Sequence, residues 1–480
     1  MSENITSLAR NTSYFTLALV IQKIISLAYF TIYARVLGPA DLGLYYFAIS
    51  VTSIFSIFID FGLGNVITRE VAKHPSKASS LFSNALSIKL IFSAITILAL
   101  VIWSYAWQYE GTTRDLIFIA AIVMIFDNFT SIGYAVLRGF HNLKFESIAS
   151  VGFQTIVLVF SLIVINLGLD IRWLMMSLVT ASIFNLVYSA YVVKKHIQLK
   201  FSFTWDWLLV KEILVITLPF AIYAIFQRFY TFFDSILLFK FAGPEAVGLY
   251  QIPFKIIVAI QFLPMAFTAS LYPALSAYWH NNREQLSITF ERAINYSLII
   301  GIPIMIGSIV LAEKIVLLFK EGFTSAAWPL QISMMAVPFM FLSFPIGALL
   351  NACDRQKRNT INIIIIAIGS ALLNLFLIPR FGVIGACITT VLTSMSMIIL
   401  GWMVVPKIIT LRTKKIVVMM IRILAAGLIM GIFAYSLKDA FHPILIIISA
   451  SAVYAFFLFL FKGFAKEDIV SIMKSFRKTA

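Results

Sequence analysis

Residues 38–45 read GPADLGLY and residues 243–250 read GPEAVGLY, which gives five identities in eight positions at an offset of 205 residues. Each copy follows a long apolar run. A single Gly-Pro turn is common, but two copies at matching places indicate an internal repeat. We therefore expect two related six-helix halves, residues 1–205 and 206–410. An additional helix pair and a cytoplasmic tail are expected over residues 411–480.

The composition places the chain in a membrane. Of 480 residues, 61% are hydrophobic and only 12% are charged, about half the charged share of a soluble protein. This balance excludes a soluble enzyme, a disordered protein and a nucleic-acid-binding protein. The net charge of +16 therefore reflects loop Lys and Arg that set membrane topology, and membrane lipids are the expected surroundings.

Apolar runs long enough to cross a bilayer recur along the whole chain. A crossing helix needs about 20 apolar residues. The expected fold is an all-α polytopic membrane protein with about fourteen transmembrane helices. The expected spans are 12–34, 43–63, 81–105, 114–137, 147–168, 172–193, 213–241, 247–272, 288–312, 325–352, 360–379, 382–405, 416–437 and 441–461.

The basic residues of the loops orient these spans. With the N-terminus in the cytoplasm, the tails and the loops after even-numbered spans carry 24 Lys and Arg, against eight in the opposite loops. The positive-inside rule then predicts that both termini are cytoplasmic in an inner-membrane protein. Two halves of six helices share one orientation, so a central cavity between them would suit alternating access.

Beyond the first five and before the last two positions of each expected span, the sequence holds eight charged residues, and each is costly inside a membrane. Lys89 and Arg422 lie near the cytoplasmic face and are expected to snorkel, while Asp60 is expected to be structural. Lys23 and Arg228 lie mid-span and are related by the repeat offset of 205. The eight residues are Lys23, Asp60, Lys89, Asp127, Arg228, Asp234, Lys255 and Arg422.

Three of the bases form the predicted substrate site. Lys23, Arg228 and Lys255 would present ammonium and guanidinium groups to a diffuse anion such as pyrophosphate. Asp127 and Asp234 are candidates for ion coupling or charge pairing, and Asp127 could pair with Lys23. The alternative interpretation is that these charges neutralise one another in structural ion pairs.

Motifs for enzyme chemistry are absent from the sequence. There is no phosphate-binding loop with Gly-Lys-Ser/Thr, no His-Glu-x-x-His and no Cys/His cluster. Cys353 and Cys387 provide no disulfide framework. We therefore expect no catalytic residues, no metal and no cofactor.

Four short motifs occur in the first half of the chain: residues 33–39 (YARVLGP), 43–45 (GLY), 60–64 (DFGLG) and 137–139 (LRG). With these motifs the chain resembles the polysaccharide-transporter branch of the multidrug/oligosaccharidyl-lipid/polysaccharide exporter superfamily, in particular O-antigen-type flippases. The resemblance implies twelve core helices and two appended ones. It also implies a cationic cavity that translocates undecaprenyl-diphosphate-linked oligosaccharide for surface polysaccharide biosynthesis, driven by an ion gradient. A polysaccharide polymerase and chain-length machinery are the implied partners.

Three other functions stay open at this point. A lipid II flippase would share the chemistry of the cargo. A multidrug exporter of the same superfamily would need an acidic cavity for organic cations, whereas the eight charged residues named above are five bases and three acids. A membrane scaffold for polysaccharide assembly would not need the buried charges at all.

Overall fold

The computed structural model describes residues 2–199 and 202–463, with side chains from residue 17 onward. Within these ranges the regular secondary structure is helical, without strands. Arg10, one of the 24 basic residues counted for the cytoplasmic side, and residues 464–480 at the end of the expected tail lie outside the residues whose side chains are described. The chain is a multi-pass membrane protein with an all-α fold, as expected from its apolar runs.

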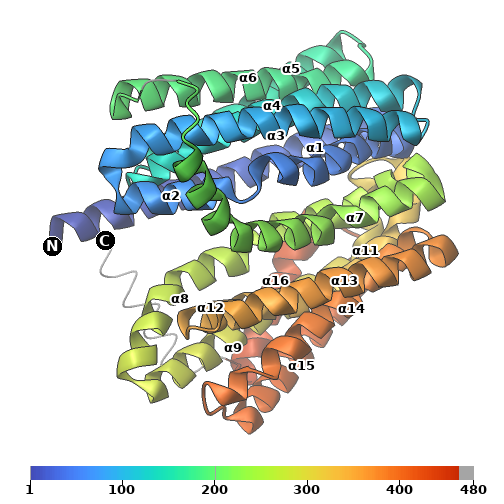
Figure 1. Cartoon of the computed structure of the whole chain (residues 1–480). Helices are drawn as coiled ribbons and strands as arrows, with labels where there is room; N and C mark the ends of the chain where they lie inside the picture. The colour runs from blue at the N-terminus through green and yellow to red at the C-terminus, as the bar shows by residue number, and fades with distance from the viewer. Residues whose placement is uncertain (1, 200–201, 464–480) are drawn as a thin grey trace. The chain divides into compact units, whose positions relative to one another are not determined.

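Figure 1 shows the course of the chain. The longer helices are α1 (Ser2–Asp60), α2 (Leu63–Lys73), α3 (Ala78–Ala106), α4 (Gly111–Gly139), α5 (Lys144–Asn166), α6 (Ile171–Val192), α7 (Trp207–Ile260), α8 (Phe262–Asn281), α9 (Arg283–Val310), α10 (Ala312–Leu317), α11 (Ala327–Met334), α12 (Val337–Ala352), α13 (Gln356–Phe381), α14 (Val383–Trp402), α15 (Thr413–Leu437) and α16 (Pro443–Leu460).

Two of these helices are broken at the repeated octapeptide. Gly38 interrupts α1 with φ 77° and ψ 177°, and Gly243 interrupts α7 with φ 83° and ψ 177°. Positive φ is a conformation that glycine adopts without the steric penalty of a Cβ atom. The two sequence copies therefore have the same backbone shape as well as similar residues.

The number of membrane crossings depends on how such breaks are counted. Eleven described stretches are long and apolar enough to cross a membrane, or twelve if the bent pair Glu321–Met334 and Val337–Ala352 is one span. Leu17–Lys73 and Trp207–Asn281 each count as one stretch, although each contains an octapeptide break. The exact number of fourteen stays a prediction.

The first compact unit comprises Met1–Gln251 and Ile363–Ala386. In it α6 packs on α4 and α5, and α1 packs on α4 and α5 (Figure 1). A buried apolar cluster joins α2, α3 and α4, with Leu63, Phe82 and Ile132 among its fully buried members. This cluster fixes the neighbourhood of the polar residues described below.

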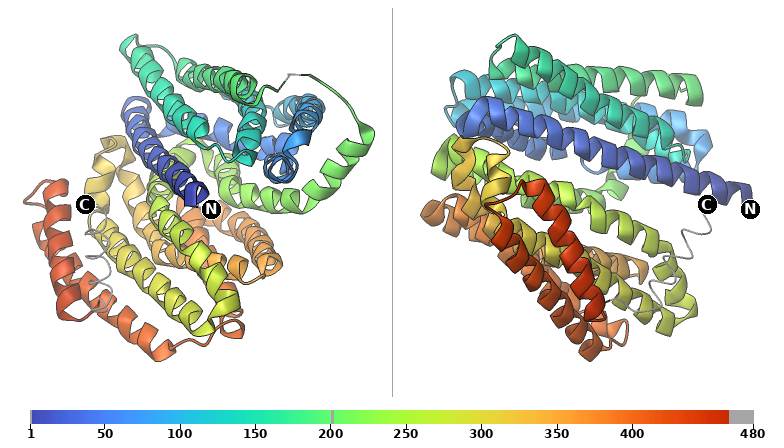
Figure 2. Two further views of the ribbon diagram at one scale, coloured as in Figure 1. Left: turned by 90° about the vertical axis from the view of Figure 1, so that its left-hand side faces the viewer. Right: turned by 180° about the vertical axis from the view of Figure 1, so that it is seen from behind.

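The second compact unit comprises Ile252–Asn362 and Cys387–Ala480. Here α15 packs between α9 and α16, and α12 packs on α8 and α9 (Figure 2). A Cβ atom on Gly427 or Gly431 would lie 2.8 or 2.7 Å from Ile306. These glycines of α15 thus allow close packing of two membrane helices.

The two contact units do not coincide with the two halves of the repeat. Residues 207–251 of α7 group with the first unit, and α15 and α16 group with the second. The units consist of helices that touch one another, whereas the halves of the repeat are related by sequence similarity. The division into residues 1–205, 206–410 and 411–480 therefore stays a prediction.

Candidate functional site

The two octapeptides touch each other inside the first unit. A Cβ atom on Gly43 would overlap the carbonyl oxygen of Pro244, and one on Gly248 would overlap the carbonyl oxygen of Pro39. Gly248 and Pro244 are the repeat equivalents of Gly43 and Pro39, 205 residues later. Each octapeptide therefore makes the same contact with the other. Both glycines are required by the close approach of two backbones rather than by their own torsions.

This contact sets a common reference point for the two related cations. Lys23 lies 15 residues before Gly38, and Arg228 lies 15 residues before Gly243. At a helical rise of 1.5 Å per residue, each cation stands about 22 Å along its helix from the break. The structure therefore supports an equivalent placement of Lys23 and Arg228 on related helices of one unit.

The environments of these cations leave their charges available. Lys23 is half-buried and Arg228 is exposed. Neither has a carboxylate within 4.0 Å among the residues whose side chains are described. The Arg228 Cζ atom lies 5.9 Å from the ring centroid of Phe232, at the outer limit of a cation–π contact.

Lys255, the third predicted base, belongs to the second unit. It lies in the last part of α7 and is half-buried. The first unit thus holds Lys23 and Arg228, and the role of Lys255 in the same site stays a proposal.

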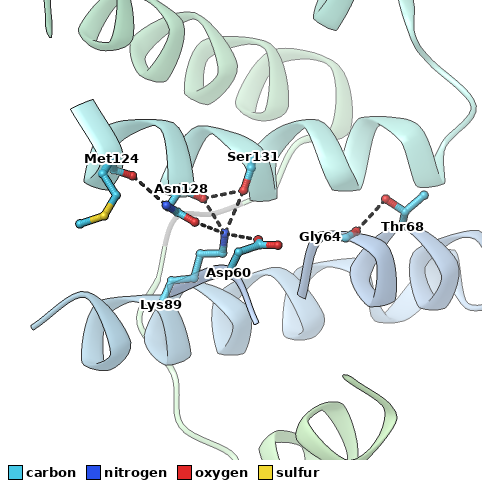
Figure 3. Close-up of polar contacts among 7 residues, drawn as sticks. All are labelled: Asp60, Gly64, Thr68, Lys89, Met124, Asn128 and Ser131. Carbon is cyan, nitrogen blue, oxygen red and sulfur yellow. Dashed lines mark hydrogen bonds and ion pairs between the residues drawn. The ribbon is translucent and has the colours of Figure 1, made fainter. Parts of the chain in front are cut away.

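Lys89 does not behave as the sequence suggested. Its side chain is 0% exposed, and its ammonium donates to Asp60 Oδ1 at 2.8 Å, to the Asn128 carbonyl at 2.8 Å and to Ser131 Oγ at 2.9 Å (Figure 3). The expectation that Lys89 snorkels to the interface is wrong. Acceptors on α4 and at the end of α1 make an interior position favourable, because they satisfy all three N–H groups.

A break in the backbone presents Asp60 to this ammonium. Helix α1 ends at Asp60, Phe61 and Gly62 follow with φ 45° and 81°, and α2 begins at Leu63. A Cβ atom on Gly62 would lie 2.9 Å from Phe220 Cβ of α7. The turn is thus pressed against the helix that carries Arg228.

Asp60 is bonded to one cation and lies in the electrostatic field of a second. Its side chain remains 38% exposed beside the fully buried Lys89, and it also experiences the charge of Arg228. One carboxylate between two bases leaves a surplus of positive charge. Sequence reasoning missed this cluster, although Asp60 and Lys89 were two unmatched opposite charges on consecutive predicted spans.

The two remaining acids have hydrogen-bond donors rather than basic partners. Ser182 Oγ donates to Asp127 Oδ1 at 2.7 Å, so the structure pairs Asp127 with Ser182 and not with Lys23. Asp234 is 7% exposed and accepts hydrogen bonds from the Tyr250 hydroxyl and the Ser235 N–H. The bond to Tyr250 bridges the break of α7 at Gly243.

Residues of the other short motifs also meet in the first unit. Arg138 Nη1 binds Glu146 Oε1 at 2.9 Å, and Thr68 Oγ1 donates to the carbonyl of Ala135 at 3.0 Å. A Cβ atom on Gly139 would lie 2.7 Å from Val71 Cγ1. The motifs at 60–64 and 137–139 therefore build the packed junction of α2 with α4, next to the Asp60–Lys89 pair.

Metal ligation finds no support in the described geometry. Over residues 17–199 and 202–463, no three His, Cys, Asp or Glu side chains are grouped as a metal site requires. The charged groups that do converge are ammonium, guanidinium and carboxylate. Such a set can bind and release an anion through charge-assisted hydrogen bonds.

Comparisons with known proteins agree with this fold. The family model described as polysaccharide biosynthesis protein matches residues 8–279, and the MatE model matches residues 219–379. An uncharacterized membrane protein of Methanocaldococcus jannaschii is 27% identical over 75% of this chain and 76% of its own length. A probable low-salt glycan biosynthesis flippase of Haloferax volcanii is 23% identical over 76% of both chains.

A solved structure has a similar fold over nearly the whole length. The lipid II flippase MurJ in an inward closed conformation superposes with a TM-score of 0.76 at 18% sequence identity, covering 95% of this chain and 99% of that one. Together with the family match over more than half of the residues, this assigns the architecture. The chain belongs to the polysaccharide biosynthesis protein family and has the fold of flippases and exporters.

Proposed function

We propose that this protein is a flippase that translocates an undecaprenyl-diphosphate-linked oligosaccharide across the cytoplasmic membrane for surface polysaccharide biosynthesis. The observation that carries the proposal is the pair Lys23 and Arg228. They occupy repeat-related positions on membrane helices and have no ion-pair partner among the described side chains. Unneutralised charge within a span is expensive and indicates an anionic cargo.

The chemistry of the two bases fits a diphosphate. Guanidinium binds two phosphate oxygens in one plane, and ammonium acts as a compact point charge. Asp60 lies near Arg228 but is itself bound to Lys89 at 2.8 Å. The Asp60 carboxylate can lower the affinity of Arg228 for the diphosphate without forming an ion pair with it. This favours cargo binding that remains reversible.

Alternating access and ion coupling belong to the same proposal. Asp234 is the stronger candidate for coupling, because it is buried and bridges the break of α7 through Tyr250. A change in its protonation would alter a contact between two segments that must move if α7 bends at Gly243. Asp127 is the weaker candidate, since its side chain is exposed.

We further propose that both termini are cytoplasmic and that a polysaccharide polymerase and chain-length machinery act on the exported cargo. The basis for the cytoplasmic termini is the excess of Lys and Arg in one set of loops. The partners follow from the proposed cargo, since an exported repeat unit must be polymerised to form a surface polysaccharide. Lipid II remains the second candidate cargo, given the fold shared with a lipid II flippase. Both cargoes carry a diphosphate, so Lys23 and Arg228 would serve either one.

Export in cells tests the function. In a strain that depends on this protein for surface polysaccharide, Lys23→Gln and Arg228→Gln should each lower the surface product about tenfold or more, since charge-assisted bonds to phosphate are lost. Protein abundance in the membrane should stay unchanged. Lys414→Gln, an exposed lysine outside the spans, is the matched control. Normal export in the Lys23→Gln and Arg228→Gln double variant would reject the site.

Cargo identity follows from complementation. Rescue of a strain lacking its O-antigen-type flippase, without rescue of one lacking its lipid II flippase, supports the proposed cargo. The reverse pattern would assign lipid II. Drug resistance conferred without either rescue would place the protein with the multidrug exporters. Full export with both cations removed would favour a scaffold.

A further inference from the structure

The second unit contains a polar pocket at the start of α9. Its volume is about 610 Å³, and it is formed by the first residues of α9 and by the connection between α14 and α15. Five charged residues line it: Arg283, Glu284, Glu291, Lys407 and Arg412. All its lining residues belong to the second unit, and Lys23, Arg228, Asp60 and Lys89 are not among them.

Both acids of the pocket have a structural task. Glu291 is 5% exposed, and its Oε1 accepts the backbone N–H of Arg412 at 2.8 Å, which fastens the connection to α9. Glu284 occupies the first turn of α9, where a carboxylate stabilises the positive end of the helix dipole. Neither acid is consumed in neutralising a side-chain cation of the pocket.

The three bases, in contrast, lack acidic partners. Arg283, Lys407 and Arg412 are exposed, and over the described side chains none has a carboxylate within 4.0 Å. The guanidinium of Arg283 stacks on Trp279, with its Cζ 3.1 Å from the ring centroid. Stacking uses the face of the guanidinium and leaves its N–H edge free for planar acceptors.

From the helices that it adjoins, we infer that the pocket lies at the level of the bilayer headgroups. It adjoins the first residues of α9 and α15, two helices that are long and apolar enough to span a membrane and that pack on each other. A membrane-spanning helix begins at the border of hydrocarbon and headgroup layers. The ring of Trp279 is of a type enriched at that border.

We propose that this pocket binds the phosphate of an anionic phospholipid headgroup, with Arg283, Lys407 and Arg412 as its ligands. Three cations that line one pocket can recognise a phosphodiester through charge-assisted hydrogen bonds. The neighbouring span ends allow the acyl chains to remain in the bilayer. The bound lipid would tie the connection before α15 to the membrane surface, independently of any transported cargo.

Lipid binding to the full-length protein tests the proposal. The protein is reconstituted in nanodiscs of phosphatidylcholine with one fifth phosphatidylglycerol, released into mild detergent, and its retained lipids are counted by native mass spectrometry. The triple variant R283Q/K407Q/R412Q should retain about tenfold less phosphatidylglycerol than the natural protein, because its charge-assisted contacts are gone. R283Q alone should show a smaller loss, which keeps the test valid if the triple variant folds poorly.

A charge-matched control separates the pocket from general attraction to the membrane. K357Q/K414Q/K415Q removes three exposed bases outside the pocket and should leave retention unchanged. Equal losses in both triple variants, or equal retention of phosphatidylcholine and phosphatidylglycerol, would overturn the proposal. Binding of millimolar inorganic phosphate that depends on these three bases, without selective retention of phosphatidylglycerol, would show a site for the free anion and reject the lipid assignment.

Discussion

Gly43 and Gly248 are packed so closely against each other's turns that neither can carry a side chain. A Cβ atom at either position would overlap a proline carbonyl of the other octapeptide. Gly43→Ala and Gly248→Ala should each destabilise the protein by about 1–3 kcal/mol, the usual cost of forcing extra volume into a packed site. Thermal unfolding in detergent measures the effect.

Gly369→Ala is the control for these substitutions. Gly369 also lies in a membrane helix, but a Cβ atom added there would meet no other helix within 4 Å among the described residues. Its replacement should be neutral or slightly stabilising, because alanine is the better helix former. A melting temperature that falls equally in all three variants would show that the reciprocal contact is not special.

The Lys89–Asp60 pair should reveal itself in a double-mutant cycle. Lys89→Met leaves the Asp60 carboxylate without its buried partner and should cost roughly 3 kcal/mol, the lower end for a broken buried pair because Asp60 is partly exposed. Asp60→Asn in the Lys89→Met background should restore much of that loss. Additive losses in the double variant would mean that the two charges do not interact.

Asp234 should matter for coupling more than for cargo binding. Asp234→Asn keeps the shape but removes the titratable group that bridges to Tyr250. We expect transport driven by a pH gradient to fall, while binding of the lipid-linked cargo stays unchanged. Asp127→Asn provides the comparison. If the Asp234→Asn variant responds to the gradient as the natural protein does, Asp234 is not the residue that couples the ion to transport.

The thiol of Cys353 should react slowly with maleimide. It is 1% exposed, and burial raises its pKa to about 11. At pH 8 only roughly one thiol in a thousand would be ionised, so maleimide labelling should be slow and should accelerate with each pH unit. The Cys353→Ser variant identifies the signal. Fast labelling at pH 8 in the folded protein would contradict this environment.

The same group gives a direction for stability against pH. Because the folded pKa lies above the ordinary value of 9.0, the unfolded chain loses the proton first as pH rises. The free energy of unfolding should therefore fall between about pH 9 and pH 11 and be independent of this thiol below that range. Cys353→Ser should flatten that part of the curve.

The sequence predicted much of the fold because membrane helices and backbone breaks leave local signals. The octapeptides at 38–45 and 243–250 predicted an internal repeat, and Gly38 and Gly243 have nearly the same backbone torsions. The buried position of Lys89 could not be predicted in the same way. Its short distance from a span end suggested snorkelling, because the sequence does not show that Asp60, Asn128 and Ser131 of other helices provide acceptors for it. Only their tertiary packing shows that three partners converge on one ammonium.

Reconstituted translocation tests the central proposal most directly. Proteoliposomes carrying a fluorescent oligosaccharide on undecaprenyl diphosphate would report flipping through quenching from one side. We predict that the natural protein moves this lipid and that Lys23→Gln with Arg228→Gln abolishes movement. The monophosphate-linked analogue should move more slowly, because it offers fewer oxygens to the two cations. Equal rates for the natural protein and the double variant would contradict the account.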